Sequence, residues 1–159
     1  MSPPRGGVRP ARPADRADVA ALWESLVAEH AALDAAFAVR PGAGAELPAA
    51  VDRILRDPAA ALWVWDGPEG VAGFCAAERR MAPPAAAERQ RIEITEIAVA
   101  PAARRQGVGT ALAQAALDWA QAQGVRRIEV RVAVRNPAGD AFWRALGFAG
   151  FVNVLDRRL

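Results

Sequence analysis

A short segment in the second half of the chain places glycines and arginines where a helical pattern begins. It reads Arg104-Arg105-Gln106-Gly107-Val108-Gly109-Thr110 and follows a β-type run that ends at Val99. The first N–H groups of a helix have no partner within the helix, and the helix dipole is positive at this end. Glycines let an anion approach such a backbone closely. The segment therefore predicts a phosphate or pyrophosphate site, with Arg104 and Arg105 adding charge at its rim.

Two widespread nucleotide-binding motifs do not fit this segment. A kinase-type phosphate loop requires a Lys, and the chain contains none. A dinucleotide fingerprint requires a third glycine where the chain has Leu112. The spacing resembles instead the Arg/Gln-x-x-Gly-x-Gly/Ala signature of the GCN5-related N-acetyltransferase (GNAT) family. The later segment Asn136–Phe148, which ends in Leu-Gly-Phe, resembles a second motif of the same family.

The resemblance implies that the chain moves acetyl from acetyl-coenzyme A, its co-substrate, to a primary amine by direct attack. In this family the fourth and fifth strands separate and the pantetheine arm lies between them. The Val99 N–H would then stabilise the oxyanion, and Asn136 would reach the coenzyme unless it only caps a helix. The residues that the resemblance assigns to the coenzyme are Ile97, Ala98, Val99, Arg104, Arg105, Gln106, Gly107, Val108, Gly109, Thr110, Asn136 and Trp143.

Direct attack also requires a base. An alkylamine has a pKa of roughly 10 and is protonated at neutral pH, so a side chain must accept its proton directly or through water. Glu93 and Glu96 precede the site on the same strand, and Glu129 is a third candidate. Glu93 is slightly preferred, because it takes the place of the base in the histone-acetylating branch of the family. The alternative is that Glu93 and Glu96 are surface charges on a half-exposed strand.

One position departs from the family pattern. The Tyr that often protonates the departing thiolate is replaced by Trp143, and the chain contains no Tyr. An indole cannot donate that proton, so the acid is water, another side chain, or unnecessary. The missing Tyr keeps a second function class open, an acyl-coenzyme A sensor with little turnover.

The elements that position these residues alternate between strands and helices. The order β-α-α-β-β-β-α-β-α-β predicts an α/β domain with a mixed sheet, which the resemblance identifies as the GNAT fold of six to seven strands with helices on both faces. Without an internal repeat or linker, residues 1–159 are expected to form a single acyl-CoA N-acyltransferase domain. Helices are expected near residues 15–30, 47–56, 107–123 and 137–146, and strands near 8–11, 61–65, 71–78, 91–99, 128–134 and 151–155.

Two features of this pattern have alternative interpretations. Ile92 and Ile94 alternate in one phase, whereas Ile97 and Val99 follow the opposite phase. A β-bulge near Thr95 or Glu96 would reconcile them, and a strand buried on both faces is the alternative. His30, the only histidine, continues the apolar stripe of the first helix; it is either a satisfied, partly buried side chain or an acceptor-site residue.

Composition and charge indicate which other classes of function and location the sequence does not favour. All 20 basic residues are Arg and the net charge is only +2, so the sequence pI of about 9.8 does not indicate a nucleic-acid partner. No apolar run approaches the ~20 residues of a membrane span. Residues 1–7 lack the apolar core of a signal peptide, and the single Cys75 suits a reducing interior, so a cytoplasmic protein is expected. No His, Cys and acid spacing predicts a metal. The acceptor is expected to be a small-molecule or peptide amine, and the resemblance leaves a homodimer open.

Overall fold

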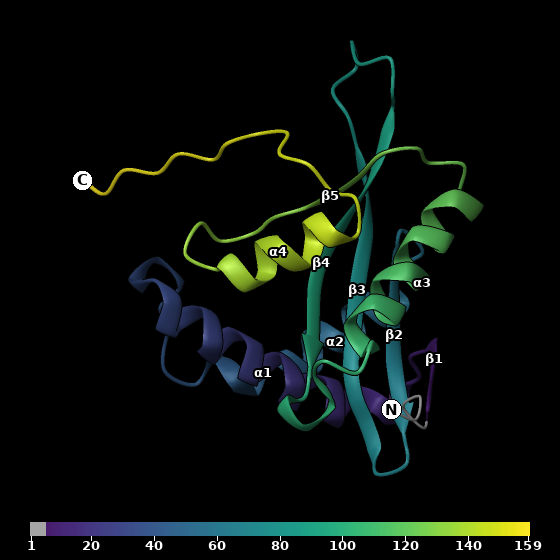
Figure 1. Cartoon of the computed structure of the whole chain (residues 1–159), viewed down its shortest axis with the longest axis vertical. Helices are drawn as coiled ribbons and strands as arrows, with labels where there is room; N and C mark the ends of the chain where they lie inside the picture. Colours follow the sequence, from purple (N-terminus) through teal and green to yellow (C-terminus); the bar gives the residue numbers. More distant parts are fainter. Residues whose placement is uncertain (1–5) are drawn as a thin grey trace.

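The fold is organised by one mixed β-sheet, shown in the computed structural model of residues 6–159 (Figure 1). Most of the segment considered for a signal peptide, residues 1–5, lies outside the described residues. Strands β1 to β4 are antiparallel neighbours, and β5 adds parallel to β4. In sheet order the strands are β1 (Gly7–Pro10), β2 (Ala60–Gly67), β3 (Gly70–Met81), β4 (Gln90–Val99) and β5 (Ile128–Val130).

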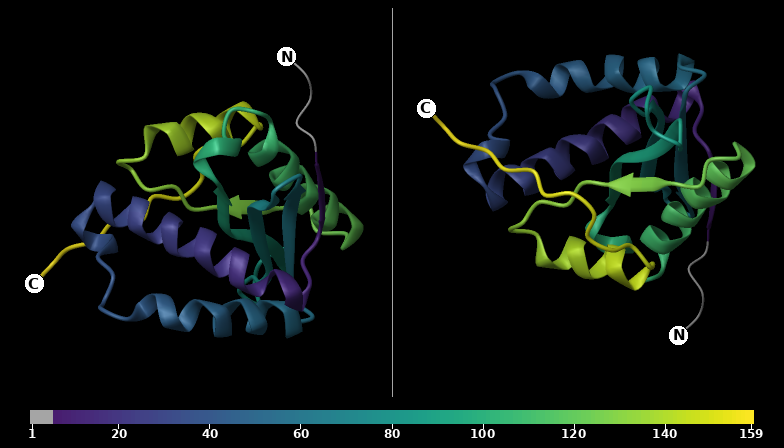
Figure 2. Two further views of the ribbon diagram at one scale, coloured as in Figure 1. Left: turned by 90° about the horizontal axis from the view of Figure 1, so that it is seen from below. Right: turned by 90° about the horizontal axis from the view of Figure 1, so that it is seen from above.

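Helices cover both faces of this sheet, as expected from the sequence. One face carries α1 and α2, and the other carries α3 and α4 (Figure 2). None of these helices, within residues 6–159, has the length and hydrophobicity that a bilayer span requires. Their bounds are α1 (Arg16–Leu33), α2 (Leu47–Arg56), α3 (Val108–Ala122) and α4 (Pro137–Ala145).

Two hydrophobic clusters hold these layers together. The central strands are buried on both faces, so neighbouring side chains enter different clusters. Cys75 and Ala77 pack with Leu112 and Trp143 on the α3 and α4 face. Phe74 and Ala76 pack with residues of α1 and α2 on the other. A residue of β4 can therefore be assigned to a face by the β3 residue opposite it.

Of the two interpretations of the phase change in β4, the β-bulge is confirmed. Ile94 lies opposite Ala77 and Glu96 lies opposite Ala76, so Thr95 has no partner on β3. The Thr95 hydroxyl donates a hydrogen bond to the Ala76 carbonyl at 3.3 Å. The additional residue returns Ile97, opposite Cys75, to the α3 face that Ile94 also occupies.

The sheet has fewer strands than the sequence predicted, and the expectation of six to seven strands is wrong. The fifth strand pairs only over Ile128–Val130 instead of residues 128–134. The expected last strand at residues 151–155 does not form, and residues 149–159 are exposed. Strand propensity becomes a strand only where a partner provides backbone hydrogen bonds. The short β5 edge provides few, and Phe151 instead lies under the Arg127 guanidinium, 4.3 Å from its ring centre.

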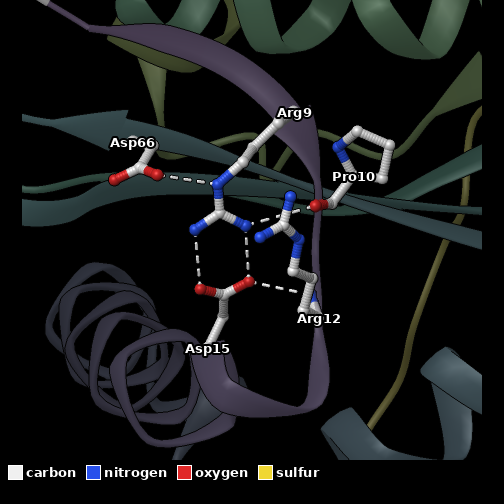
Figure 3. A network of polar contacts seen from close by, with 5 residues as sticks. All are labelled: Arg9, Pro10, Arg12, Asp15 and Asp66. Carbon is white, nitrogen blue, oxygen red and sulfur yellow. Dashed lines mark hydrogen bonds and ion pairs between the residues drawn. The ribbon is translucent and has the colours of Figure 1, made fainter.

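An ion-pair network joins β1 to the start of α1 (Figure 3). The Arg9 guanidinium donates two hydrogen bonds to the Asp15 carboxylate, at 2.7 and 2.8 Å, and a third to Asp66 on β2 at 2.7 Å. Asp15 is buried and also accepts a hydrogen bond from the Arg12 N–H. These bonds, the Arg9 contact foremost, hold the pKa of Asp15 below its ordinary value. The network fixes the first helix against the sheet edge.

We expect Asp15→Ala to lower the free energy of unfolding at pH 7 by about 2–3 kcal/mol, because it breaks a buried, charge-assisted contact. Asp66→Ala, at the exposed end of the network, is the control and should cost less than about 1 kcal/mol. The depressed Asp15 pKa stabilises the fold above the unfolded value of roughly 3.9, and this stabilisation is lost as pH falls through the folded value. Urea denaturation at pH 7 and pH 3 should show the difference between wild type and Asp15→Ala shrinking at low pH; a constant difference would contradict this role.

Candidate functional site

A cavity of about 550 Å³ opens where β4 and β5 separate. Pairing of the two strands stops at Ile94 and Val130, directly before the bulge. Beyond that point the cavity is lined by the second half of β4, the loop before α3, the residues after β5, and parts of α1 and α4. Residues from both faces of the sheet line it, so the cavity passes through the gap between the strands.

The backbone of β4 has unpaired hydrogen-bonding groups along this gap. The Ala100 N–H donates to the Ala72 carbonyl on β3 at 2.8 Å. Because bonding direction alternates along an antiparallel strand, the N–H groups of Ile97 and Val99 point away from β3. Within residues 6–159 no fifth-strand residue pairs with them. Both residues and Ala98 between them line the cavity.

The loop before α3, beyond the end of β4, forms a cradle of backbone amides at residues 105–110. Gly107, the N-cap of α3, has a φ of 83°, and Arg105 has a φ of 62°, the one positive value among the non-glycine residues of the described chain. Alternation of left-handed and ordinary backbone turns successive N–H groups into a concave anion site. A left-handed Arg is strained, and such strain is concentrated at functional sites. Arg105, Gly107, Gly109 and Thr110 all line the cavity.

Arg104 lines the cavity but its side chain is already engaged. Its Nε donates to the Val99 carbonyl at 2.8 Å, and its guanidinium pairs with Glu29 on α1. Arg104 therefore connects the cradle to the first helix. Its charge is largely neutralised there, and Arg105 is the freer cation at the rim.

Helix α4 forms the wall opposite β4. The Asn136 side chain accepts a hydrogen bond from the Gly139 N–H at 3.0 Å, so it does cap α4, and it also lines the cavity. Trp143 lines the cavity and is otherwise buried between Phe142 and Phe148, with ring centres at 4.9 and 5.1 Å. Its indole is thus a packing surface.

Glu96 is the acidic side chain that lines the cavity. It lies opposite Ala76, on the face that α1 covers. Among residues 6–159 it has no ion pair and no side-chain hydrogen bond. Burial raises its pKa to about 7. A partly buried, unpartnered carboxyl group that titrates near neutrality is suited to accept a proton at physiological pH.

The other candidate bases lie elsewhere. Glu93 does not line this cavity; its carboxylate is paired with Arg80 and Arg131, both at 3.3–3.5 Å. Glu129 is paired with Arg91 at 2.9 Å. The bulge does place Glu93 and Glu96 on the same face of the sheet, but the Glu93 carboxylate is already ion-paired with two arginines.

Two residues assigned to the coenzyme also lie outside the cavity lining. Gln106 is exposed, and its side chain donates to the Ala102 carbonyl at 2.9 Å. Val108 is buried in the cluster on the α3 face. Their backbone lies in the same turn and helix start as the other residues assigned to the cradle.

Sequence reasoning did not find several cavity residues, including Leu26, Arg131 and Phe142. Leu26 belongs to the apolar stripe of α1, and nothing in a helical stripe distinguishes a residue at a cavity from one in the core. Phe142 precedes Trp143 in the second family-like segment, and its ring lies 3.4 Å from the position of a Cβ at Gly109. Arg131 continues the alternation of β5, whose end could not be located from the pattern.

The Cys75 thiol and the possible metal-ligating side chains of the described residues are not placed for nucleophilic or metal chemistry. Cys75 is fully buried, and burial raises the pKa of its thiol to about 12, so it is not a nucleophile at neutral pH. Among residues 6–159 no group of three or more His, Cys, Asp or Glu side chains is arranged to hold a metal ion.

Comparison with known proteins gives a family match over most of the chain. The model of the Acetyltransferase (GNAT) family matches residues 21–148. The mycothiol acetyltransferase of Renibacterium salmoninarum is 33% identical over 120 residues, which cover 72% of this chain and 35% of that protein. The chain spans about a third of the length of the curated relatives it matches.

Solved structures share the fold at lower identity. A mutant of the BH1408 protein from Bacillus halodurans superposes with a TM-score of 0.87 at 19% identity, covering 96% of this chain and 98% of that chain. An aminoglycoside N-acetyltransferase, AAC(6')-Iy in complex with CoA, gives a TM-score of 0.73 at 20% identity, covering 100% and 99%. These structural similarities show that the chain shares the fold of these proteins.

We expect Glu96→Gln to stabilise the protein above neutral pH. The folded pKa of about 7 lies above the unfolded value of roughly 4.3, so the folded state binds the extra proton between them and stability falls as pH rises through this window. Glutamine removes that loss, which amounts to up to about 3 kcal/mol at pH 8 and vanishes near pH 4. Thermal and urea denaturation at pH 4 to 8 measure the difference. Glu93→Gln, which removes an ion-paired carboxylate, should give no such gain; identical curves for Glu96→Gln and wild type would show that Glu96 is not desolvated.

Proposed function

Because the chain belongs to the Acetyltransferase (GNAT) family, we propose that residues 1–159 form an acyl-CoA N-acyltransferase domain that transfers acetyl from acetyl-coenzyme A to a primary amine by direct attack. The observation that carries the proposal is the cavity between β4 and β5. It joins an anion cradle, a row of unpaired strand amides and a partly buried carboxyl group in one continuous space. These are the three things that such a transfer requires.

We propose a place for each part of the coenzyme in this arrangement. The pyrophosphate would lie on the amides from Arg105 to Thr110, with the Arg105 side chain adding positive charge. The pantetheine arm would follow β4, with the N–H groups of Ile97 and Val99 donating to it. The Val99 N–H would donate to the thioester carbonyl oxygen as negative charge develops there during attack.

Glu96 would act as the base. The acceptor nitrogen must lose a proton before it can attack, and Glu96 would take that proton directly or through a water molecule. Its pKa of about 7 keeps a useful fraction ionised at neutral pH without making it too weak a base. The pairing of Glu93 with two arginines makes it the poorer candidate.

The acid step differs from the usual pattern of the family. The indole N–H of Trp143 is far too weak an acid to protonate a thiolate, and the ring is packed between two phenylalanine rings. The departing thiolate is therefore protonated by water or leaves as the anion, since a thiolate is a fair leaving group. The same feature supports the second candidate, an acyl-coenzyme A sensor that binds through the same cradle with little turnover.

The acceptor is proposed to be a small-molecule or peptide amine. The mycothiol and aminoglycoside acetyltransferases that the chain resembles are named for small-molecule substrates. A cytoplasmic location, where acetyl-coenzyme A is made, is proposed with it. A homodimer rests on the family resemblance alone.

We expect release of free coenzyme A from acetyl-coenzyme A when the protein meets an acceptor from a panel of kanamycin, spermidine, glycinamide and a lysine-containing peptide. A thiol reagent follows the reaction. With the best acceptor, Glu96→Gln should lower kcat about 100-fold or more at pH 7, with partial recovery at higher pH, and should remove the rise of kcat/KM through pH 7.

Glu93→Gln is the matched control, because it changes a carboxylate three residues away on the same face, and its rise through pH 7 should persist. If Glu93→Gln alone loses the rate, Glu93 is the base. Tight coenzyme binding without thiol release from any amine would favour the sensor.

We expect Gly109→Val to weaken coenzyme A binding at least tenfold in calorimetry. A Cβ at Gly109 would already lie 3.4 Å from the Phe142 ring and 3.7 Å from the Val99 side chain, so a branched side chain fills the cavity between β4 and α4. Gly7→Val is the control, because a Cβ there meets nothing within 4 Å and Gly7 lies on β1, outside the cavity. Unchanged affinity in a folded Gly109→Val protein would contradict the cradle.

A further inference from the structure

A histidine on α1 lines the same cavity as Glu96. His30 is the only histidine in the chain, it is half-buried, and it lies near the C-terminal end of the helix. The neighbouring helical turn contributes Leu26 to the cavity wall. The base and cradle proposed above do not use this side chain.

A backbone contact fixes the tautomer of the neutral His30 imidazole, that is, which ring nitrogen carries the proton. The Nδ1 atom of His30 lies 2.9 Å from the Leu26 carbonyl oxygen, one turn earlier in α1. A carbonyl can only accept, so Nδ1 must carry the proton. The other nitrogen, Nε2, then carries a lone pair, and among residues 6–159 no side chain or backbone group donates to it.

A second contact fixes the plane of the ring. The Phe37 ring, in the short turn after α1, meets the imidazole edge to face, with centres 5.7 Å apart and planes at 76°. With one nitrogen turned toward the helix backbone and the ring held by Phe37, the Nε2 lone pair points away from the α1 backbone. A preset orientation of this kind lowers the entropy that a ligand must overcome on binding.

The position of His30 relative to the sheet indicates which substrate it meets. It belongs to α1, which covers the face that Glu96 occupies. The side chains of Ile97 and Val99, and those of α4, pack on the opposite face. The proposed path of the coenzyme follows the cradle and α4, so the α1 face is the one left for the acceptor.

The charges around His30 agree with an amine acceptor. The charged side chains that share the cavity with it are Glu96 on β4, Arg104 and Arg105 before α3, and Arg131 after β5. Arg104 and Arg131 are each paired with a glutamate outside the cavity lining. Arg105 belongs to the cradle before α3 and has no ion pair among the described residues. On the α1 face of the cavity, the groups without a partner within residues 6–159 are the Glu96 carboxyl group and the His30 lone pair, and both attract a hydrogen-bond donor.

We propose that His30 is a specificity-determining residue for the acceptor: Nε2 accepts a hydrogen bond from the acceptor amine and orients its nitrogen toward Glu96. This inference rests on the proposed function, because it assigns the acceptor side of that cavity. The His30 side chain selects primary alkylamines over alcohols of the same shape, because an ammonium group can donate to Nε2 and to Glu96 at once. A second proton on the imidazole removes the lone pair and the selectivity with it.

Nitrogen-15 NMR tests the proposal without turnover, because the single histidine gives one unambiguous pair of ring signals. In the protein with coenzyme A bound, we expect Nδ1 protonated and Nε2 unprotonated, with the Nε2 signal moved by n-butylamine and not by n-butanol. An Nε2-protonated ring, or equal responses to the two probes, would overturn the proposal.

Substitutions separate the two ring nitrogens. His30→Asn can keep the donor to Leu26 but has no atom at Nε2, whereas His30→Gln places an amide oxygen near Nε2 that does not titrate. With the best acceptor of the panel, we expect His30→Asn to raise the acceptor KM about tenfold or more with little change in kcat or coenzyme affinity. His30→Gln should restore KM to within about threefold.

The outcomes distinguish this inference from the proposed function. A response of Nε2 to n-butylamine without thiol release from any amine would overturn the transferase and leave His30 as an amine-binding residue. Thiol release with an unchanged acceptor KM in His30→Asn would overturn the role of His30 and leave the transferase intact.

Discussion

The additional residue in β4 is the constraint on which the site depends. A strand that kept its phase would turn Ile97 to the other face of the sheet and Glu96 toward α3. By leaving Thr95 unpaired, the chain keeps its apolar side chains on the α3 face and brings Glu96 to the α1 face. Pairing with β5 ends at the same point, at Ile94 and Val130. One local irregularity thus both opens the gap and places the carboxyl group inside it.

The site is maintained against its own energetic preferences. Burial disfavours the ionised form of Glu96, Arg105 holds a left-handed backbone conformation, and the unpaired strand amides beyond the bulge lack a partner strand. The rest of the molecule supplies the stability that permits this, through two clusters packed on a sheet buried from both sides. The Arg104 contacts to Val99 and Glu29 tie the cradle, β4 and α1 together, so the two faces of the cavity are held in register.

Elements with a strong local pattern could be predicted closely. The helix expected at residues 47–56 has those bounds, and the glycine-containing segment at residues 104–110 does begin a helix, because glycine spacing and apolar periodicity are local properties. The absence of the last strand could not be predicted, because residues 151–155 have strand propensity but the short β5 edge offers them few backbone groups to pair with. The choice between Glu93 and Glu96 had the same difficulty. Both are acids on one strand, and only the distant Arg80 and Arg131 distinguish them.

The sequence by itself determined the family and the order of the elements up to α4, and it located the helix start that we propose as the pyrophosphate site. These depend on motifs in which every necessary residue lies within a few positions of the next. Only the tertiary structure decided which carboxyl group faces the cavity and which nitrogen of His30 is free. It also decided that α1 covers the face of the sheet that carries Glu96. Those properties arise from residues tens of positions apart, whose burial and partners exist only after the sheet and both helical layers have assembled.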